Sequence, residues 1–588
     1  MGQILKANLT TGETGLFFIP PEWERQYLGG ASLGARMLYD RLTPELVPLS
    51  PQAPLLFING PLSGTAGPVV GRSVVCARSP LTGLWGESNF GGFWGAELRL
   101  CGYLGLWVEG RAETPVYLWI QDQKVEVRSA IHLWGLDTYQ TQAAIQAELD
   151  AGKISVAAIG PAGEKIIPYA LILTDHGRVA GRTGMGAVMG SKNLKAIAVS
   201  GTSKTPIADR AAYDEAVKQI RENQKENPTV VGMQMNGTAG LISVVNVMGA
   251  LPTKNFQTGT FEAAEEIAGS AITEKNRVKG FACASCPVGC SLISEIKSGA
   301  FAGRRSEGPE YESTVMLGSN LNISNLDTII AANYLCDELG LDTISAGNVI
   351  GFAMECYEKG LLTDADTGGI SITWGNGDAL LSLLELIAKK EGIGTRLSQG
   401  VARLSKEIPS SEAFAMHVKG LELAAYDPRG VFGQGLSYAI APRGGEHGRG
   451  GYMIVEFFLP DVDLYTHEGK AARAIELAEL AAVYDMTCLC NFNFVPLELI
   501  PPLINAIVGG NYTEADLRAI ARRTITLERR FNIREGFSRK DDTLPPRLLN
   551  EPLPDGMAAG KKVEGLDIML DEYYTIMGWD KEGIPPKA

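Results

Sequence analysis

Apolar and β-branched residues occur in short runs over the first third of the chain, and glycine- and proline-rich turns separate these runs. The clearest runs are APLLFING, SVVCARS, PVYLWIQD and AIAVSG. Runs of this length, bounded by turn residues, are typical of β-strands. We therefore predict a β-rich domain at residues 1–208.

The pattern changes near residue 211, where apolar residues begin to recur with helical periodicity. We predict helices over RAAYDEAVKQIRENQKEN, DTIIAANYLCDELG, DTISAGNVIGFAMECYEKG, GDALLSLLELIAKKEG and GKAARAIELAELAAVYDM. These helices predict two mainly α-helical domains, at residues 209–415 and 416–588. The fold class is accordingly α+β and multidomain.

The composition is that of a globular protein, with 588 residues, 45% apolar and 20% charged, and one hydrophobic core rarely serves so long a chain. The N-terminal MGQILKANLTTGETG lacks the apolar region of a signal peptide, and no apolar run is long enough to span a bilayer. We expect a cytoplasmic protein with reduced thiols. A formal net charge of -14 disfavours nucleic acid and anionic membranes as partners, because both select clustered basic surfaces.

Basic residues are concentrated in one segment, ARRTITLERRFNIREGFSRK at 521–540, where acidic residues interleave with them. We interpret this segment as a solvated helix face whose charges pair within the segment. It therefore does not predict a nucleic-acid site.

Three of the nine cysteines lie in CASCPVGC, with the spacing C-x2-C-x3-C: Cys283, Cys286 and Cys290. An odd count in a reducing compartment argues against a disulfide framework. A zinc site usually needs a second two-ligand knuckle, and the remaining close pair, Cys488 and Cys490, has only one residue between them. Three thiolates on a tight loop suit a [4Fe–4S] cluster closed by a remote cysteine, either Cys488 or Cys490. Zinc remains the alternative.

Two aspartates share a second pattern, D-x-x-small-Leu, at the ends of predicted helices. Asp337 lies in DELGLD and Asp485 in DMTCLC. An acidic side chain near a helix C-terminus is poorly placed against the helix dipole, so two of them are unusual. An aspartate in that position can accept hydrogen bonds from a donor-rich ligand such as a pterin ring.

These motifs resemble the aldehyde:ferredoxin oxidoreductase family of tungsten enzymes, which carry two pyranopterins. The resemblance covers essentially the whole chain, and CASCPVGC, GPEYES, CDELGLDT, YDPRG and DMTCLC occur in the family's order. It implies a cofactor at the domain interface and a [4Fe–4S] cluster whose fourth ligand is Cys490. It also implies that Asp337 and Asp485 each bind one pterin. Nearby backbone contacts would come from Gly340, Leu341, Asp342 and Leu489. Cys488, which stands where the family has glycine, would also lie at the cofactor, where its thiol would crowd the pterin edge or act as a spare redox group.

The same resemblance assigns the phosphate side of the cofactor to the first domain. Arg72 and Arg178 match the family's phosphate-side arginines, and the carbonyls of Asn89 and Val179 would hold a Mg²⁺ that links the two phosphates. Arg72 lies in GRS at 71–73. The glycine-rich segments SNFGGFWG and HGRVAGRTGMG, which contain the other three residues, also contribute Gly91, Gly92, Gly181 and Arg182. GMGAVMG lacks the spacing and the preceding strand of a dinucleotide-binding loop.

The resemblance matches two further residues to the family's reacting centre, Glu312 in EGPEYES and His447 in PRGGEHGRG. It implies oxidation of an aldehyde to a carboxylic acid, with Glu312 as general base and His447 polarising the carbonyl. A related catalytic subunit that reduces an aromatic thioester, and an iron–sulfur relay without tungsten, are the alternatives. Molybdenum has nearly the same ligand chemistry as tungsten, so the sequence leaves both metals open.

The expected electron acceptor is ferredoxin or a small ferredoxin-like subunit. A ferredoxin is acidic, so this acidic chain needs a local basic patch near the cluster. A dimeric family member carries inter-subunit metal ligands in a Glu-Ala-Asn-His stretch, which here reads AANY with Ala331 and Tyr334. We expect a homodimer or hetero-oligomer without that metal.

Overall fold

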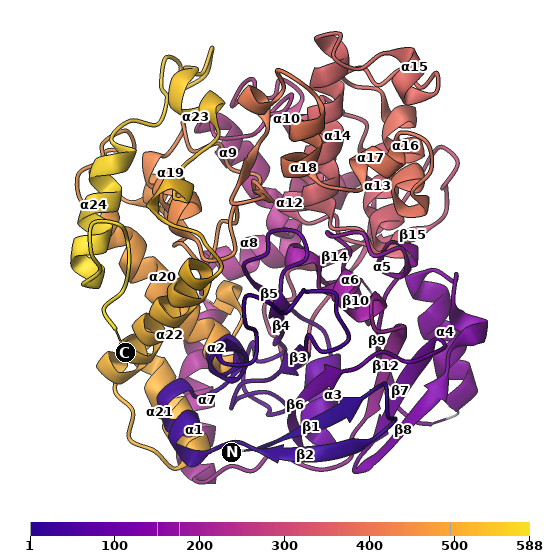
Figure 1. Cartoon of the computed structure of the whole chain (residues 1–588). Helices are drawn as coiled ribbons and strands as arrows, with labels where there is room; N and C mark the ends of the chain where they lie inside the picture. Colours follow the sequence, from indigo (N-terminus) through magenta and orange to yellow (C-terminus); the bar gives the residue numbers. More distant parts are fainter. Residues whose placement is uncertain (1, 150, 176, 494, 588) are drawn as a thin grey trace.

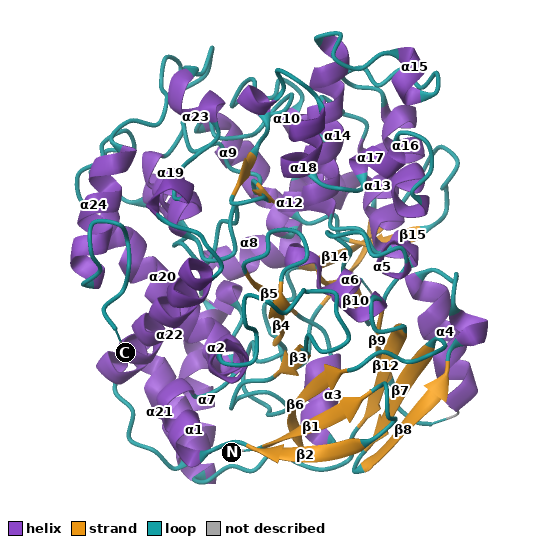
Figure 2. Ribbon diagram, in the orientation of Figure 1, coloured by secondary structure: helices purple, strands orange, loops and turns teal. Residues whose placement is uncertain are grey.

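A computed structural model describes residues 2–149, 151–175, 177–493 and 495–587 of the chain (Figures 1 and 2). Its first part holds two six-stranded sheets, with strand orders β2-β1-β6-β3-β4-β5 and β11-β10-β9-β12-β7-β8. Each sheet contains one parallel pair, β1 with β6 and β7 with β12, and is otherwise antiparallel. The strands are β1 (Gln3–Asn8), β2 (Thr14–Phe18), β3 (Leu55–Ile58), β4 (Ser73–Arg78), β5 (Trp85–Phe90), β6 (Tyr103–Glu109), β7 (Val116–Gln121), β8 (Lys124–Ser129), β9 (Ser155–Ala158), β10 (Ile172–Thr174), β11 (Arg178–Ala180) and β12 (Leu194–Ser200).

Short helices connect these strands. They are α1 (Pro21–Tyr27), α2 (Gly30–Tyr39), α3 (Trp94–Leu100), α4 (Thr138–Leu149), α5 (Pro161–Glu164) and α6 (Met185–Gly190). The facing sides of the two sheets share one apolar core, in which Phe57, Leu106, Ile197 and Val199 are fully buried. The predicted β-rich first part of the chain is therefore confirmed.

The rest of the chain is mainly helical, as predicted, and occupies the upper and left parts of Figure 1. Its first half contains α7 (Arg210–Lys225), α8 (Pro228–Asn236), α9 (Ile242–Val247), α10 (Ala264–Ile267), α11 (Gly269–Lys275), α12 (Tyr311–Leu317), α13 (Leu326–Leu339), α14 (Thr343–Glu358), α15 (Asp364–Thr367), α16 (Gly377–Lys389), α17 (Gly394–Leu397) and α18 (Val401–Glu407). Its second half contains α19 (Phe432–Ile440), α20 (Lys470–Thr487), α21 (Ile500–Val508), α22 (Glu514–Arg534), α23 (Pro546–Asn550) and α24 (Leu566–Met577).

Strands that the sequence patterns did not predict lie between these helices. They are β13 (Arg277–Phe281), β14 (Ser291–Glu295), β15 (Arg305–Glu307), β16 (His417–Val418) and β17 (Leu421–Glu422). The first three form an antiparallel sheet, and its first hairpin carries the loop with the three clustered cysteines.

The five predicted helices correspond to α7, α13, α14, α16 and α20, and side-chain caps fix several of their first residues. The carboxylate of Asp209 accepts from Ala212 N before α7, and the side-chain oxygens of Asn325 and Asn376 cap α13 and α16 in the same way. A cap of this kind satisfies a backbone donor that has no partner inside the helix.

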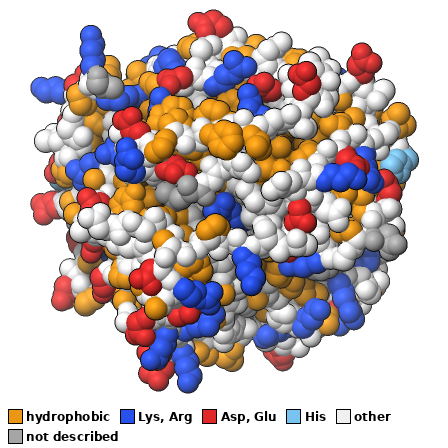
Figure 3. Space-filling view, turned by 90° about the horizontal axis from the view of Figure 1, so that it is seen from below, with side chains coloured by type: hydrophobic (Ala, Val, Ile, Leu, Met, Phe, Trp, Pro, Cys, Tyr) orange, Lys and Arg blue, Asp and Glu red, His pale blue; other side chains and the backbone are white. Residues whose placement is uncertain are grey.

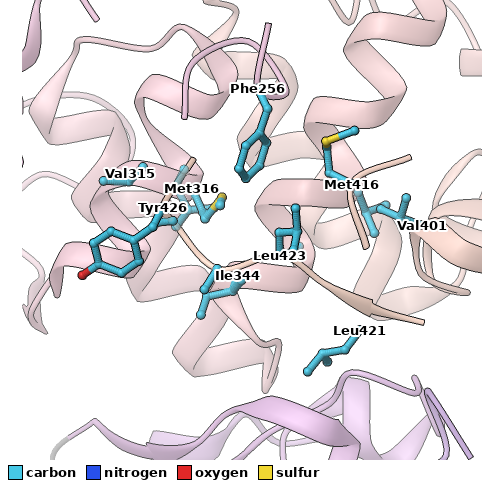
Figure 4. Packing of buried hydrophobic residues seen from close by; sticks show 14 of the residues in the cluster. Phe256, Val315, Met316, Ile344, Val401, Met416, Leu421, Leu423 and Tyr426 are labelled. Atoms are coloured by element: carbon cyan, nitrogen blue, oxygen red, sulfur yellow. The ribbon is translucent and has the colours of Figure 1, made fainter. Parts of the chain in front are cut away.

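The largest apolar core lies among these helices and joins residues on both sides of the predicted boundary at 415/416. In Figure 4, Met316 of α12, Ile344 of α14 and Leu423 point toward one another, with Phe256 above them. The division of the helical part into two domains at that boundary stays a prediction.

The basic segment at 521–540 lies in and just after α22, but it is not simply a solvated face. Glu528 and Arg529 are buried and bind Arg449 and Asp542 of other segments. Arg522 binds Glu479 of α20. The expectation of pairing within the segment was largely wrong, because this helix lies between other elements and its charges reach across to them.

The surface carries charges of both signs. On the face seen in Figure 3, hydrophobic side chains form a band, and acidic and basic side chains are interspersed around it. Among the described residues, no single helix is both long and apolar enough to cross a bilayer. The pair 228–236 and 238–247 passes that test only when taken together, and it is bent by 111°.

We predict that Gly340→Ala destabilises the protein more than Gly360→Ala. Both glycines have left-handed backbone angles, φ 79° and φ 70°, which cost an alanine about 1 kcal/mol. A Cβ at Gly340 would also lie 2.9 Å from the backbone N of Gly160, whereas Gly360 faces open space. Thermal unfolding should show a drop of about 1 kcal/mol for Gly360→Ala and at least about 2 kcal/mol for Gly340→Ala. Equal losses would contradict this close packing.

Candidate cofactor and active site

Four cysteines from two distant segments line one pocket. Cys283, Cys286 and Cys290 lie on the loop between β13 and β14, and Cys490 follows the end of α20. Positive φ angles at Ser285 and Gly289 give this loop its turns. The other lining residues are Val69, Gly71, Arg72, Arg178, Val288, Gly289 and Phe492.

The spacing of these thiols bears on the choice between zinc and a cluster. Zinc–sulfur bonds of about 2.3 Å require all four thiolates of a zinc site to converge on one point. Among the described residues, no three Cys, His, Asp or Glu side chains converge closely enough to hold a single metal ion. Four cysteines around one shared pocket match a [4Fe–4S] cluster, which takes one thiolate for each of its four irons.

Arg72 lies directly against this pocket. Its Nε and Nη2 donate to Cys490 Sγ over 3.4 and 3.2 Å. Burial would lower the pKa of Arg72, but Cys490 and Cys283 beside it raise the pKa above its usual value. Burial also raises the pKa of Cys286 to about 11, so a bound cation is needed to favour its thiolate at neutral pH.

The two helices with the predicted aspartates end in the same way. Gly340 follows α13 with φ 79° and ψ 40°, and Cys488 follows α20 with φ 58° and ψ 32°. The N–H groups of Leu341 and Leu489 then bond to Cys336 O and Tyr484 O, over 2.8 and 3.0 Å. Both ends are therefore left-handed C-caps, which explains the shared D-x-x-small-Leu pattern.

Both helix ends pack against glycines of the first part of the chain. A Cβ added at Gly160 would lie 2.5 Å from Leu339 O, and one added at Gly60 would lie 2.2 Å from Thr487 O. A Cβ added at Gly30 would lie 1.9 Å from Asp485 O. Contacts this short exclude any side chain, so these glycines let the helix ends reach the sheets.

Asp337 and Asp485 are both buried near these ends. Tyr139 Oη donates to Asp337 Oδ2 over 3.3 Å, and burial together with Glu307 raises the pKa of Asp337 well above its usual value. Asn89 Nδ2 donates to Asp485 Oδ1 over 2.9 Å. Burial raises the pKa of Asp485 to about 6 against the opposing effect of Arg449.

Sequence reasoning missed a buried charge network around Asp485. The guanidinium nitrogens of Arg449 lie 3.2 Å from a carboxylate oxygen of Glu87 and 3.4 Å from one of Asp485, and they are closer still to Glu528. The Arg449 side chain is only 2% exposed. Arg443 lies 2.9 Å from Glu446 and 3.8 Å from Glu87. Both arginines flank the predicted His447 in PRGGEHGRG, and their density in one short motif was the available signal.

The predicted phosphate-side residues lie against the same two ends and the cysteine loop. Arg182 Nε is 3.4 Å from Asp342 Oδ2, and Asp342 also caps α14 by accepting from Ile344 N and Ser345 N. Arg178 approaches Glu307 and Glu310. The other predicted residues lie close by: Asn89 on β5, Gly91 and Gly92 just after it, Val179 on β11 and Gly181 just after that strand.

Buried donors without partners indicate an anionic ligand at this place. Among the described residues, Arg178 Nη2 and Arg182 Nη1 are buried and have no hydrogen-bond partner. A Cβ at Gly91 would lie 2.7 Å from Cys283 Sγ, so the backbone there is bare and close to the pocket. Two guanidinium groups with free donors beside exposed backbone suit the oxygens of a phosphate-bearing cofactor.

Glu312 and His447 lie 135 residues apart but face each other. His447 Nδ1 is 3.4 Å from Glu312 Oε1, and Glu312 Oε2 accepts from Ala425 N over 2.9 Å. Burial raises the pKa of Glu312, and His447 lowers it in part. The rings of Tyr426 and Tyr452 pack against the His447 ring, with centroids 5.4 and 5.8 Å from its own. They form an aromatic wall that sequence reasoning did not identify.

The position of the Cys488 thiol differs from the expectation that this thiol crowds a cofactor or acts as a spare redox group. Its side chain is fully buried among apolar residues of the first sheet and α2, and Sγ lies 3.8 Å from Asp485 O. Burial raises the pKa of Cys488 to about 12. A left-handed backbone turns this thiol away from the pocket lined by Cys490.

The chain is similar along its full length to known oxidoreductases. Residues 4–201 match the family model for the aldehyde ferredoxin oxidoreductase N-terminal domain, and residues 215–588 match that for domains 2 and 3. The tungsten-containing aldehyde ferredoxin oxidoreductase of Pyrococcus furiosus is 41% identical over 100% of this chain and 97% of its own length. The chain belongs to the aldehyde ferredoxin oxidoreductase family.

More distant members have other activities in their names. The aliphatic sulfonate oxidoreductase WOR-like subunit of Pyrococcus furiosus is 33% identical over 99% of this chain and 95% of its own. The solved active-site complex BamBC of benzoyl coenzyme A reductase, with bound 1,5-dienoyl-CoA, is 26% identical. It superposes with a TM-score of 0.85 over 100% of this chain and 95% of that chain.

Replacement of Arg449 should be strongly destabilising. We expect Arg449→Met to cost about 3–5 kcal/mol, because it leaves Glu87, Asp485 and Glu528 buried without their cation. The loss should shrink at lower pH, where Asp485 and Glu528 take up protons, because burial raises the pKa of both carboxyls. Thermal unfolding at two pH values measures both effects.

The matched control is Arg210→Met, which removes an exposed pair with Asp214 at 2.9 Å and should change little. A similar small change in Arg449→Met would show that the network does not stabilise the fold.

Proposed function

We propose that this protein oxidises aldehydes to carboxylic acids with a tungsten bis-pyranopterin cofactor and passes the electrons through a [4Fe–4S] cluster to ferredoxin. The observation that carries the proposal is the half-buried Glu312–His447 contact, in a chain 41% identical from end to end to an enzyme of that name. Acid reduction is the reverse of the same reaction.

The residues present fit both groups. Cys283, Cys286, Cys290 and Cys490 would ligate the cluster, and Arg72 would remain hydrogen-bonded to the Cys490 sulfur. Asp337 and Asp485 would each accept from one pterin, with backbone groups of Gly340, Leu341, Asp342 and Leu489 alongside. Because the N–H groups of Leu341 and Leu489 close the helix caps, these two residues would contribute their carbonyls.

On the phosphate side, the free donors of Arg178 and Arg182 support a dianionic group next to Gly91, Gly92 and Gly181. The carbonyls of Asn89 and Val179 would complete a Mg²⁺ site, since Mg²⁺ takes oxygen ligands. The two dithiolenes of the pterins would supply four sulfur ligands, so tungsten would need no direct protein ligand, and molybdenum would suit the same surroundings.

When bound, the cofactor accepts the two electrons of the reaction, RCHO + H₂O → RCOOH + 2 H⁺ + 2 e⁻. His447 would donate to the carbonyl oxygen of the aldehyde and make its carbon more electrophilic. Glu312, in its ionised form, would take the proton of the attacking water. Burial of this carboxylate raises its pKa, which makes it a stronger base than an exposed glutamate. Tyr426 and Tyr452 would exclude bulk water from one side.

Reduction of an aromatic acyl thioester is the second candidate. The solved benzoyl coenzyme A reductase complex shares the fold, but its identity of 26% is well below the 41% of the aldehyde enzyme. An iron–sulfur relay without tungsten is less supported, because it gives no role to the Glu312–His447 pair or to the free arginine donors.

The inter-subunit metal of the Glu-Ala-Asn-His type is not part of this proposal. Ala331 is 3% exposed and Tyr334 is 8% exposed. The Tyr334 ring stacks on the ring of Tyr139 and lies under the guanidinium group of Arg304. Neither side chain has metal-ligating chemistry toward a second subunit. A homodimer or a pairing with a small ferredoxin-like subunit stays a prediction.

Glu312→Gln should lower kcat for aldehyde oxidation by about 10²–10⁴-fold, because the general base is lost while the shape is kept. Tungsten and iron contents should not change. In the unaltered enzyme, kcat should fall as pH drops through the raised pKa of Glu312, and Glu312→Asp should keep such an acidic limb. A kcat within a few-fold of the unaltered enzyme would remove Glu312 from the mechanism.

Cys490→Ser should reduce the iron content below about four per chain and abolish the spectrum of a [4Fe–4S] cluster. Cys488→Ser is the matched control, since this neighbouring thiol is buried away from the pocket. The control should retain its iron. Loss of iron in Cys488→Ser alone would reverse the ligand assignment.

A further inference from the structure

The cysteine loop is the tip of a hairpin at the edge of the β13-β14-β15 sheet, in which β13 is an outer strand. Cys283 follows β13 after one residue, and Cys290 directly precedes β14. Ser285 and Pro287 at the tip are exposed. This hairpin therefore brings two of the pocket's cysteines next to exposed residues, where an electron could leave the protein.

Helix α8 packs directly on the hairpin, near the centre of Figure 1. Gln234 Nε2 donates to Pro287 O over 2.9 Å, and a Cβ added at the C-cap Gly237 would lie 3.1 Å from Cys290 O. Arg277 Nη1 of β13 donates to Met235 O over 2.8 Å, which joins helix and strand. These contacts join helix α8 to the tip and to β13, and the exposed side chains of the three are here called the hairpin face.

The centre of the hairpin face is apolar and exposed. Val231 and Met235 of α8 are 45% and 56% exposed, and Val278 of β13 is 40% exposed. Single exposed apolar residues are ordinary, but three on two joined elements beside a pocket of four cysteines are not scattered at random. An apolar centre of this kind is typical of a contact surface.

The rim of the hairpin face is basic, with Lys275 at the end of the neighbouring helix α11 and Arg277 and Lys279 on β13. Among the described residues, no carboxylate lies within ion-pair distance of Lys275, Arg277 or Lys279. The acid nearest in the sheet, Glu295 of β14, is already held by Lys297 and Arg305 at 2.8 and 3.0 Å. Residues 274–281 carry three Lys or Arg and one Glu, a formal charge of +2, in a chain whose net charge is -14.

We propose that the hairpin face is the docking surface for an acidic iron–sulfur electron carrier. The proposal rests on the proposed function and specifies where its acceptor binds. Each aldehyde oxidised releases two electrons, so two oxidised carriers bind in turn, and each leaves with one electron. A small apolar centre with a charged rim suits such a short-lived complex, and complementary charge speeds the encounter.

Charge on an outer strand has another recognised use, since it discourages pairing with a second sheet. A glutamate at Lys279 would serve that purpose as well as a lysine. Reversal of sign therefore separates the two roles.

The test compares the holoenzyme with its Lys275→Glu/Lys279→Glu variant, using an acidic [4Fe–4S] ferredoxin or benzyl viologen as acceptor. At low ionic strength, kcat/KM for ferredoxin should fall by about tenfold or more in the variant, and its dependence on salt should weaken. Activity with benzyl viologen should not fall, because this small dication needs no docking surface. Lys581→Glu, beyond α24 on another part of the surface, should leave both activities unchanged.

A second variant tests the apolar centre. Met235→Ser should raise KM for ferredoxin, whereas Val247→Ser on α9, which removes a side chain 64% exposed, should not. Unchanged ferredoxin kinetics in the charge-reversed variant would overturn the proposal. The proposal would also be overturned if the unaltered protein formed a dimer, or bound anionic vesicles, and the charge-reversed variant did not. Absence of aldehyde oxidation with either acceptor in the unaltered holoenzyme would instead refute the proposed function.

Discussion

Buried guanidinium groups between the sheets and the helices are the constraint on which this structure depends. A charge taken out of water is costly unless it meets an opposite charge or hydrogen-bond acceptors. Arg443 and Arg449 meet a set of buried carboxylates that includes Asp485. Arg178 and Arg182 are only partly matched, and some of their buried donors have no partner among the described residues. The unmatched part of this charge is what a phosphate-bearing cofactor would satisfy.

The same constraint explains how the two halves of the chain are held together. Two left-handed helix caps, at Gly340 and Cys488, turn the chain against the glycines of the sheet region. Each cap brings an aspartate, Asp337 or Asp485, into the interior, where it needs a hydrogen-bond donor. The end of α20 also carries Cys490 into the pocket of the hairpin cysteines. One type of local turn thus positions both the proposed pterin sites and the fourth proposed cluster ligand.

Much of this arrangement could be predicted from the sequence, because its signals are local. Helical periodicity gave α7, α13, α14, α16 and α20, and motif spacing gave the three clustered cysteines. The choice between Cys488 and Cys490 is not local: it depends on the left-handed turn that directs one thiol into the core and the next toward the pocket.

Features made by contacts between distant segments were missed. The network of Arg449 joins four segments, and no periodicity or spacing connects Glu87 with Glu528. The small sheet β13–β15 was missed as well, because its strands are short and flank a cysteine-rich loop. The basic segment at 521–540 was misjudged for the same reason, since its partners lie elsewhere in the chain.

The most direct test is a metal analysis of protein purified without oxygen, counting tungsten, molybdenum, iron and zinc per chain. About one tungsten or molybdenum with about four irons, and no zinc, is the result that this account predicts. Zinc without iron would contradict the cluster assignment. Iron without tungsten or molybdenum, in protein produced with both metals supplied, would contradict the proposal that the buried arginines and aspartates hold a metal–pterin cofactor.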